Sequence, residues 1–217
     1  MKKYGIRIIK MIFGLFLCAL GSVITMRANL GFTAWNCFHQ GISLTTGVTI
    51  GMANTLVGMV ILCADLALHE RIGIGSICNM LLIGPFTDLI IAWDVLPTMQ
   101  TWYTGVGMMI IGMFVVAFGT CFYISSQFGA GPRDSLMVAL ARRTGLKPGW
   151  CRIGIETTVT VIGWFLGGPV GVGTLIGAFG QGTCLQGVFQ LMHFKPTEIH
   201  HENFRELWHN LKGVCEK

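Results

Sequence analysis

The chain repeats itself at an offset of 98 residues, and this repeat constrains its fold more than any other feature. The stretch MIFGLFLCALGSVITMRANLG (11–31) aligns without a gap to MIIGMFVVAFGTCFYISSQFG (109–129). Eight of the eleven glycines in the first half fall on glycines of the second, where composition alone predicts about one or two. The chain is therefore a duplicated unit, and both halves should fold alike.

Each unit contains three long apolar segments, and only 12% of the chain is charged, against roughly 25% in soluble domains. An apolar helix of about 17–25 residues crosses a bilayer, so we expect an all-α integral membrane protein with about six transmembrane helices. The first segment also resembles a signal peptide, but it lacks a small-x-small cleavage site and recurs mid-chain, which favours a retained span. The predicted spans cover about 6–27, 49–68, 73–93, 102–125, 150–167 and 171–192.

A fourth segment in each unit, about 33–44 and 132–143, is too short to cross. PRDSLMVALARR (132–143) begins with proline, a frequent first residue of helices, and carries charge at both ends. We interpret both segments as re-entrant or interfacial half-helices. If they crossed fully, the chain would have eight spans in parallel repeats, and Arg71 would lie outside the cell.

Three crossings per unit predict that the two repeats are inverted relative to each other. The basic clusters at the amino terminus, around 69–71, across 132–152 and in the tail then all fall on one side, which the positive-inside rule assigns to the cytoplasm. We therefore expect a multi-pass protein of the bacterial cytoplasmic membrane with both termini cytoplasmic. The predicted parts are a first repeat (1–98), a second repeat (99–193) and a cytoplasmic amphipathic tail (194–217).

Several classes of function lack their sequence signatures. The eight cysteines are scattered singly, the histidines of the tail have no compact spacing, and the nucleotide-binding, hydrolase and zinc-protease motifs are absent. No basic stripe with interleaved aromatic residues indicates nucleic-acid binding. We expect no enzyme, metal or cofactor; the expected partners are the lipid bilayer and an unidentified small molecule or ion, and a homodimer is compatible with so small a bundle.

Two stretches of the second repeat carry a family resemblance. YISSQFGAGPRDSLMVALARRTG (123–145), together with RIGIETTVTVIGWFLGGPVGVGTL (152–175), resembles the YczE/YyaS/YitT family of bacterial integral membrane proteins, and its YczE branch in particular. The resemblance implies a membrane architecture but no substrate. Family members have Pro-Trp-Asp where this chain has Ala34-Trp35-Asn36, which argues against a role there that needs a carboxylate.

Ionisable residues within predicted spans are the leading candidates for function, because a charge in lipid is costly unless it faces a cavity or a partner. Asp88 and Glu156 are candidate proton-coupling or substrate groups, although Glu156 can also pair with Arg152 four residues earlier. Asp65 is expected to be interfacial only. Further candidates for a substrate or ion site are Arg133, Asp134, Asn36 and Gln186. Gly31, Gly129 and Gly131 are expected to let a ligand or a neighbouring backbone come close.

The duplicated membrane unit favours a transporter or permease-like protein for a small polar, anionic solute, because inverted repeats with broken helices form transporter sites near the membrane centre. In this hypothesis Arg133 and Asp134 form a contact on the cytoplasmic side; the structural alternative is that they pair locally at a helix start. Two other interpretations stay open. One is a non-transporting accessory or scaffold protein for a partner enzyme, and the other is the substrate-binding component of a larger transporter.

Overall fold

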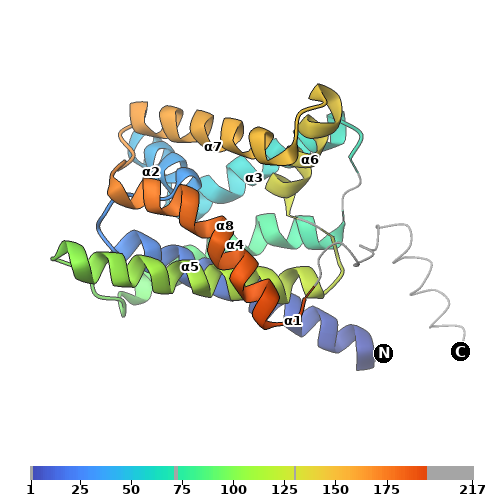
Figure 1. Ribbon diagram of the computed structural model, residues 1–217, viewed down its shortest axis with the longest axis horizontal. Helices are drawn as coiled ribbons and strands as arrows, with labels where there is room; N and C mark the ends of the chain where they lie inside the picture. Colours follow the sequence, from blue (N-terminus) through green and yellow to red (C-terminus); the bar gives the residue numbers. More distant parts are fainter. Residues whose placement is uncertain (1, 71–72, 130, 195–217) are drawn as a thin grey trace, which may run out of the picture.

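The computed structural model describes residues 2–70, 73–129 and 131–194, which form a bundle of eight α-helices without a β-strand (Figure 1). The predicted tail from residue 195 onward lies outside the described residues. The helices are α1 (Lys2–Arg27), α2 (Ala34–Thr46), α3 (Ile50–Ala67), α4 (Ile74–Trp93), α5 (Trp102–Ser125), α6 (Pro132–Thr144), α7 (Pro148–Phe165) and α8 (Val172–Leu191).

The predicted segments are confirmed as helices, with boundaries within a few residues of those expected. Glycine and proline set several of these ends. The two short helices α2 and α6 end at Gly47 and Gly145, whose φ angles of 77° and 71° lie in the left-handed region that glycine adopts without strain. Pro132 and Pro148 occupy the first turns of α6 and α7, where a missing N–H costs nothing.

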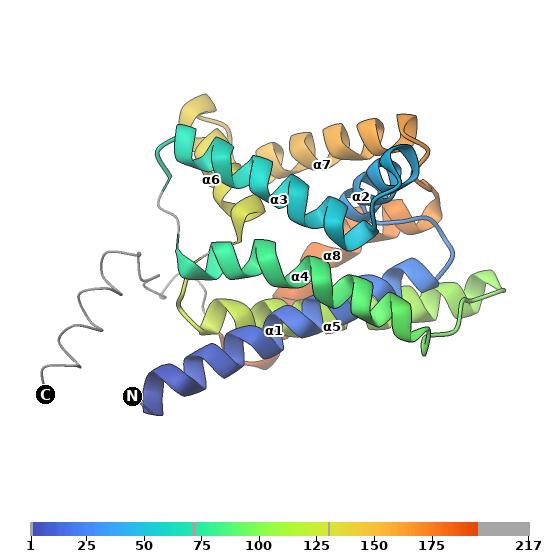
Figure 2. The same ribbon diagram turned by 180° about the vertical axis from the view of Figure 1, so that it is seen from behind.

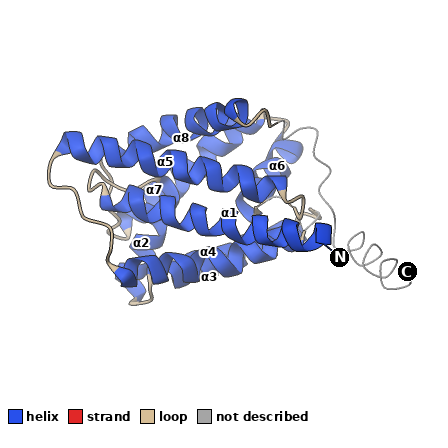
Figure 3. Cartoon of the chain, turned by 90° about the horizontal axis from the view of Figure 1, so that it is seen from below, coloured by secondary structure: helices blue, strands red, loops and turns tan. Residues whose placement is uncertain are grey.

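The helices form two layers. In one layer the order is α8, α5, α1, α4, with the long helices α1 and α5 in the centre (Figure 3). In the other, α2, α3, α6 and α7 contact one another in a closed ring, in which the short helices α2 and α6 separate α3 from α7 (Figure 2). Contacts between α3 and α4 join the layers on one side.

Helices α1 and α5 cross in antiparallel orientation through two pairs of glycines. A Cβ atom added to Gly14 would lie 2.7 Å from the carbonyl oxygen of Gly119, and one added to Gly21 would lie 2.7 Å from that of Gly112. Only glycine permits backbones to approach this closely. Gly14 corresponds to Gly112 in the repeat and Gly21 to Gly119, so each glycine contacts the counterpart of the other.

The connecting loops meet at the two ends of the bundle through matching hydrogen bonds. At the end where α1 begins, called the N-terminal end here, Gly75 N donates to Phe128 O at 2.8 Å. At the opposite end, Gly173 N donates to Leu30 O at 2.7 Å. Both donor and acceptor of the first bond lie 98 residues from their counterparts in the second, so the same local structure closes both ends.

Four of the described helices are long and apolar enough to cross a membrane, which agrees with a multi-pass membrane protein. These are α1 from Tyr4 onward, α3, α4 and α5. Helices α7 and α8, with 18 and 20 residues, are as long as α3 and α4, but α7 carries the charged residues Arg152 and Glu156 and α8 is rich in glycine.

Candidate functional site

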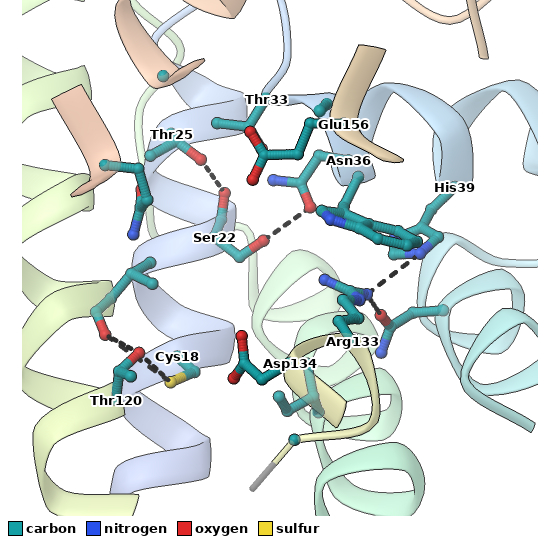
Figure 4. A pocket seen from close by; sticks show the side chains of 18 of the residues that line it. Cys18, Ser22, Thr25, Thr33, Asn36, His39, Thr120, Arg133, Asp134 and Glu156 are labelled. Carbon is teal, nitrogen blue, oxygen red and sulfur yellow. Dashed lines mark hydrogen bonds between the residues drawn. The ribbon is translucent and has the colours of Figure 1, made fainter. Parts of the chain in front are cut away.

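A cavity of about 430 Å³ lies between the two layers, and each of the eight described helices contributes to its wall. Its size is typical of sites for small molecules. The wall is polar at many positions, and it includes charged side chains of α6 and α7 (Figure 4). Polar residues lining it are Ser22, Thr25, Thr33, Asn36, His39, Asn54, Asn79, Thr87, Thr120, Arg133, Asp134, Arg152, Glu156 and Gln181.

The first turns of the two short helices meet in this cavity. The guanidinium carbon of Arg133, on α6, lies 4.4 Å from the ring centroid of Trp35, on α2, in a cation–π contact. The residues that precede these helices, Thr33 and Gly131, have extended backbones and make no side-chain hydrogen bond to the first turn. Both helix starts therefore point their positive dipole ends into one polar space without a side-chain cap.

Arg133 is the best-anchored charge of the site. Its Nη2 donates to Asn54 Oδ1 at 2.5 Å and lies 3.3 Å from His39 Nε2. Burial, and secondarily the charge of Arg133, holds the pKa of His39 well below its usual value, so this imidazole is neutral and its Nε2 can accept a hydrogen bond. Burial also lowers the pKa of Arg133 to about 10, which still leaves the guanidinium charged at neutral pH.

Asp134 follows Arg133 directly but points the other way, toward Cys18 and Thr120 on the side of α1 and α5 (Figure 4). Its side chain is exposed to the cavity, which is partly open. Desolvation by the surrounding helices raises the pKa of Asp134, although the charges of Arg152 and Arg133 act in the opposite direction. Among the described residues, neither Arg133 nor any other side chain forms an ion pair or hydrogen bond with it.

The predicted pair on α7 is present. Arg152 Nε donates to Glu156 Oε1 at 2.8 Å in an i,i+4 ion pair that lies in the cavity wall. Asn36, on the first turn of α2, also lies in the wall, where its Oδ1 accepts a hydrogen bond from Ser22 Oγ at 3.0 Å. Glu156 and Asn36 thus line the same cavity as Arg133 and Asp134.

Two predicted site residues lie elsewhere. Asp88 caps the start of α3: its carboxylate accepts hydrogen bonds from Thr49 Oγ1 at 2.5 Å and from Gly51 N at 2.8 Å, and it does not line the cavity. Gln186 is exposed on α8, away from the cavity. Asp65, which we expected at the interface, is fully buried, and both of its carboxylate oxygens lack a hydrogen-bond partner among the described residues.

The three glycines expected to permit close approach divide into two kinds. Gly31 and Gly129 have φ angles of 98° and 123°, and added Cβ atoms would lie 2.4 Å from Gly171 N and 2.9 Å from Gly73 Cα. Close backbone approach is confirmed at both. At Gly131 an added Cβ would reach only ordinary contact, 3.5 Å from Asn79 Nδ2, and this residue lines the cavity, where a ligand rather than a backbone can come close.

Sequence reasoning did not select Trp35, His39 or Asn54 as site residues, yet these three hold the guanidinium of Arg133. The repeat carries a signal that could have identified two of them. Trp35 lies 98 residues before Arg133, and Asn54 lies 98 residues before Arg152. Other equivalent positions that meet in the cavity are Asn36 with Asp134 and Ser22 with Thr120.

Comparison with known proteins gives a family but no activity. Residues 5–190 match a family described as a family of unknown function, DUF6198. The chain is 33% identical to the uncharacterized membrane protein YczE of Bacillus subtilis over 80% of each chain. It is 31% identical to an uncharacterized protein of Haemophilus influenzae over 81% of this chain and 80% of the relative. The uncharacterized protein YyaS of Bacillus subtilis is 25% identical over 87% and 92%.

These matches confirm the resemblance to YczE and YyaS. No solved structure matches the chain.

Proposed function

The chain belongs to the family of unknown function DUF6198, and we propose that it is a permease-like transporter which binds a small anionic solute between two inverted membrane repeats. One observation carries this proposal: equivalent positions of the two repeats converge on a single polar cavity that all eight described helices line. A site shared by both repeats near the membrane centre is a recurring feature of transporters with inverted repeats.

The exchange of glycine partners between α1 and α5 supports the inverted arrangement. Because the equivalent helices α1 and α5 run antiparallel, their two repeats have opposite orientations. Gly14 contacts Gly119, the counterpart of Gly21, and Gly21 contacts Gly112, the counterpart of Gly14. A two-fold axis in the membrane plane requires this exchange of partners. Helices α7 and α8 are about 27 and 30 Å long, enough to complete six spans. The 13-residue helices α2 and α6 reach only about 20 Å, less than the hydrocarbon core of about 30 Å.

The contacts of α2 support a re-entrant path. Added Cβ atoms at Gly163 and Gly168, in and just after the last turn of α7, would lie 2.7 Å from Phe38 and 2.3 Å from Cys37, while one at Gly41 would lie 2.8 Å from Leu166. Most of the length of α2 therefore lies against the same end of α7. The helix starts at the cavity and remains in one half of the bundle.

Charges at the two ends support a cytoplasmic N-terminal end. There Arg7 Nε donates to Ser126 O, and Arg142 pairs with Glu70 at 3.0 Å. The opposite end contains Arg27, which pairs with Asp94. More of the basic side chains thus lie at the N-terminal end, which the positive-inside rule assigns to the cytoplasm.

The chemistry of the cavity favours an anion. The uncapped starts of α2 and α6 and the fixed guanidinium of Arg133 create a positive potential in the cavity. These groups can bind a negative group without rearranging. Trp35, Asn54 and His39 hold the guanidinium in place. Alternating access would then arise as the repeats rock around this shared site, opening it to each end in turn.

Transport by purified protein in liposomes tests the proposal. The probes are labelled acetate, succinate, alanine, taurine and inorganic phosphate, which together cover carboxylate, sulfonate and phosphate groups; alanine and taurine carry an ammonium group as well. We expect uptake of at least one probe and a loss of about tenfold or more in Arg133→Gln, because a hydrogen bond to a charged group contributes about 1.5–3 kcal/mol. The matched control is Gln186→Ala, at an exposed position outside the cavity. If the folded protein neither takes up nor binds any of these probes, transport of such solutes is refuted.

The orientation of the repeats has its own test. On a cysteine-free background, single cysteines at Val95 and Val170 should react with a membrane-impermeant reagent added outside cells, whereas one at Leu146 should not. All three side chains are well exposed in the native protein, at 77%, 46% and 55%. Labelling of Leu146→Cys from outside, with Val95→Cys protected, would reverse the proposed orientation; labelling of all three would contradict the inverted repeats.

A further inference from the structure

Among the described residues, four charged side chains line the cavity, and two of them pair with each other. Arg152 and Glu156 form an ion pair at 2.8 Å within α7. The remaining two are Arg133 and Asp134, adjacent residues on the first turn of α6. Because no ion pair joins Arg133 to Asp134 among the described residues, the site presents one cation and one anion that are separately available.

The two charges have different degrees of satisfaction. Asn54, His39 and Trp35 hold the guanidinium of Arg133, but these partners are neutral, and no carboxylate of the described residues forms an ion pair with it. The carboxylate of Asp134 has no hydrogen-bond partner among the described residues, and its side chain is exposed to the partly open cavity. A ligand in the cavity can therefore reach this carboxylate without displacing a protein partner, and a positively charged group would form a charge-assisted hydrogen bond with it.

The repeat provides an internal comparison for this position. Asn36 is the counterpart of Asp134 and also lies in the cavity wall, but its side-chain oxygen already accepts a hydrogen bond from Ser22. The neutral member of the pair is therefore satisfied within the protein, and the charged member is not. At this position the two halves of the cavity therefore differ in a feature that would recognise a positively charged group.

The directions of the two side chains complete the argument. Arg133 points toward His39, while Asp134 points toward Cys18 on the other side of the first turn of α6 (Figure 4). A ligand with only a negative group would bind Arg133 but be repelled by the nearby carboxylate of Asp134. A ligand with only a positive group would bind Asp134 but be repelled by Arg133. A ligand with both groups can satisfy both side chains at once.

We propose that the solute is a small zwitterion of the amino-acid class, whose carboxylate binds at Arg133 and whose ammonium group binds at Asp134. The inference rests on the proposed function and specifies it: the negative group of the solute is a carboxylate, and an ammonium group on the same molecule balances its charge. Trp35 covers one face of the guanidinium and leaves the ligand carboxylate to approach along the edge, where its N–H groups point.

Ligand-induced thermal stabilisation of the detergent-solubilised full chain tests the inference. The probes are the standard amino acids, each compared at equal concentration with the carboxylate that lacks its amino group and the amine that lacks its carboxylate; for alanine these are propionate and ethylamine. We expect at least one amino acid to raise the unfolding midpoint. At the same concentration, the increase in midpoint with each of its two analogues should be at least tenfold smaller. This comparison uses the native protein and does not depend on a variant that folds.

A variant then assigns the ammonium contact. Asp134→Asn should weaken binding of the amino acid by about tenfold or more, the usual effect of losing a charge-assisted hydrogen bond. The same variant should leave binding of the amino-free carboxylate unchanged or tighter, because it removes a repulsive charge. Gln186→Ala is the control for handling and folding.

The possible results separate the two proposals. If a carboxylate binds as well as its amino acid and Asp134→Asn binds both equally, then Asp134 carries a proton or is a spectator, and the zwitterion inference fails while anion binding stands. If no amino acid stabilises the protein, the inference also fails, and liposome uptake of acetate, succinate or phosphate still decides the proposed function.

Discussion

The substitution Gly21→Ala tests the close crossing of α1 and α5, on which the relation between the two repeats depends. An added Cβ would lie 2.6 Å from Val116 N and 2.7 Å from Gly112 O, where ordinary contact begins at 3.4 Å. It is therefore about 0.7 Å too close to backbone atoms, which cannot rotate away as a side chain can. The two helices must separate locally to admit one methyl group.

The cost follows from this overlap. Forcing extra atoms into a packed interface destabilises a protein by about 1–3 kcal/mol, and the rigid backbone here favours a value of about 2 kcal/mol or more. Alanine also gains about 0.5–1 kcal/mol over glycine within a helix, which would obscure the loss. Gly107→Ala, also in α5 and with nothing within 4 Å of its added Cβ, has the same gain without the overlap.

Thermal unfolding of both variants in the same detergent measures the difference directly. About 2 kcal/mol corresponds to roughly 4–8 °C for a chain of this size, so Gly21→Ala should unfold that much below Gly107→Ala. Gly119→Ala, at the equivalent position of the other repeat, should lose a similar amount. Equal midpoints for Gly21→Ala and Gly107→Ala would mean that α1 and α5 do not approach through these glycines.

Three further substitutions separate structural roles from roles in the cavity, and the same thermal assay measures them. Asp88→Ala removes the cap of α3 and should cost about 1–2 kcal/mol, without changing ligand binding; a loss of binding at full stability would instead connect Asp88 with the solute. Asp65→Asn should not lower the midpoint, because the buried carboxylate has no partner to lose; a marked loss would reveal a partner. Glu70→Gln breaks its ion pair with Arg142, whose side chain is 67% exposed, and should cost at most about 1 kcal/mol; a larger loss would make this pair a structural clamp.

The helices could be predicted from the sequence because their ends depend on local chemistry. Long apolar runs fix which segments are buried in lipid, and glycine or proline interrupts the chain at Gly47, Pro132, Gly145 and Pro148. The repeat added a second, independent observation of each boundary. Six spans, by contrast, remain a prediction, since by length and composition only four of the described helices are long and apolar enough to cross a membrane.

The site was less predictable because a sequence does not say where a buried polar side chain points. Asp88 and Asp134 both looked like candidates, yet one caps a helix and the other faces the cavity. Asp65 near a helix end looked interfacial but is enclosed by the packing of the helices. Trp35 carries no charge, and its role appears only when α6 brings Arg133 against its ring.

The two kinds of repeated position point to different constraints on the proposed transporter. Glycines at the α1–α5 crossing and in the end loops are preserved in both halves, because each close approach must be made twice for the halves to pack alike. Positions that face the cavity have diverged, from Trp35 to Arg133 and from Asn36 to Asp134. A solute without two-fold symmetry can occupy the shared cavity in only one orientation at a time, so it needs different side chains from the two repeats. Different side chains at equivalent positions of the cavity wall are therefore what binding of one asymmetric solute requires of a duplicated fold, whereas a purely structural duplication gives no physical reason for both charges to lie in one half.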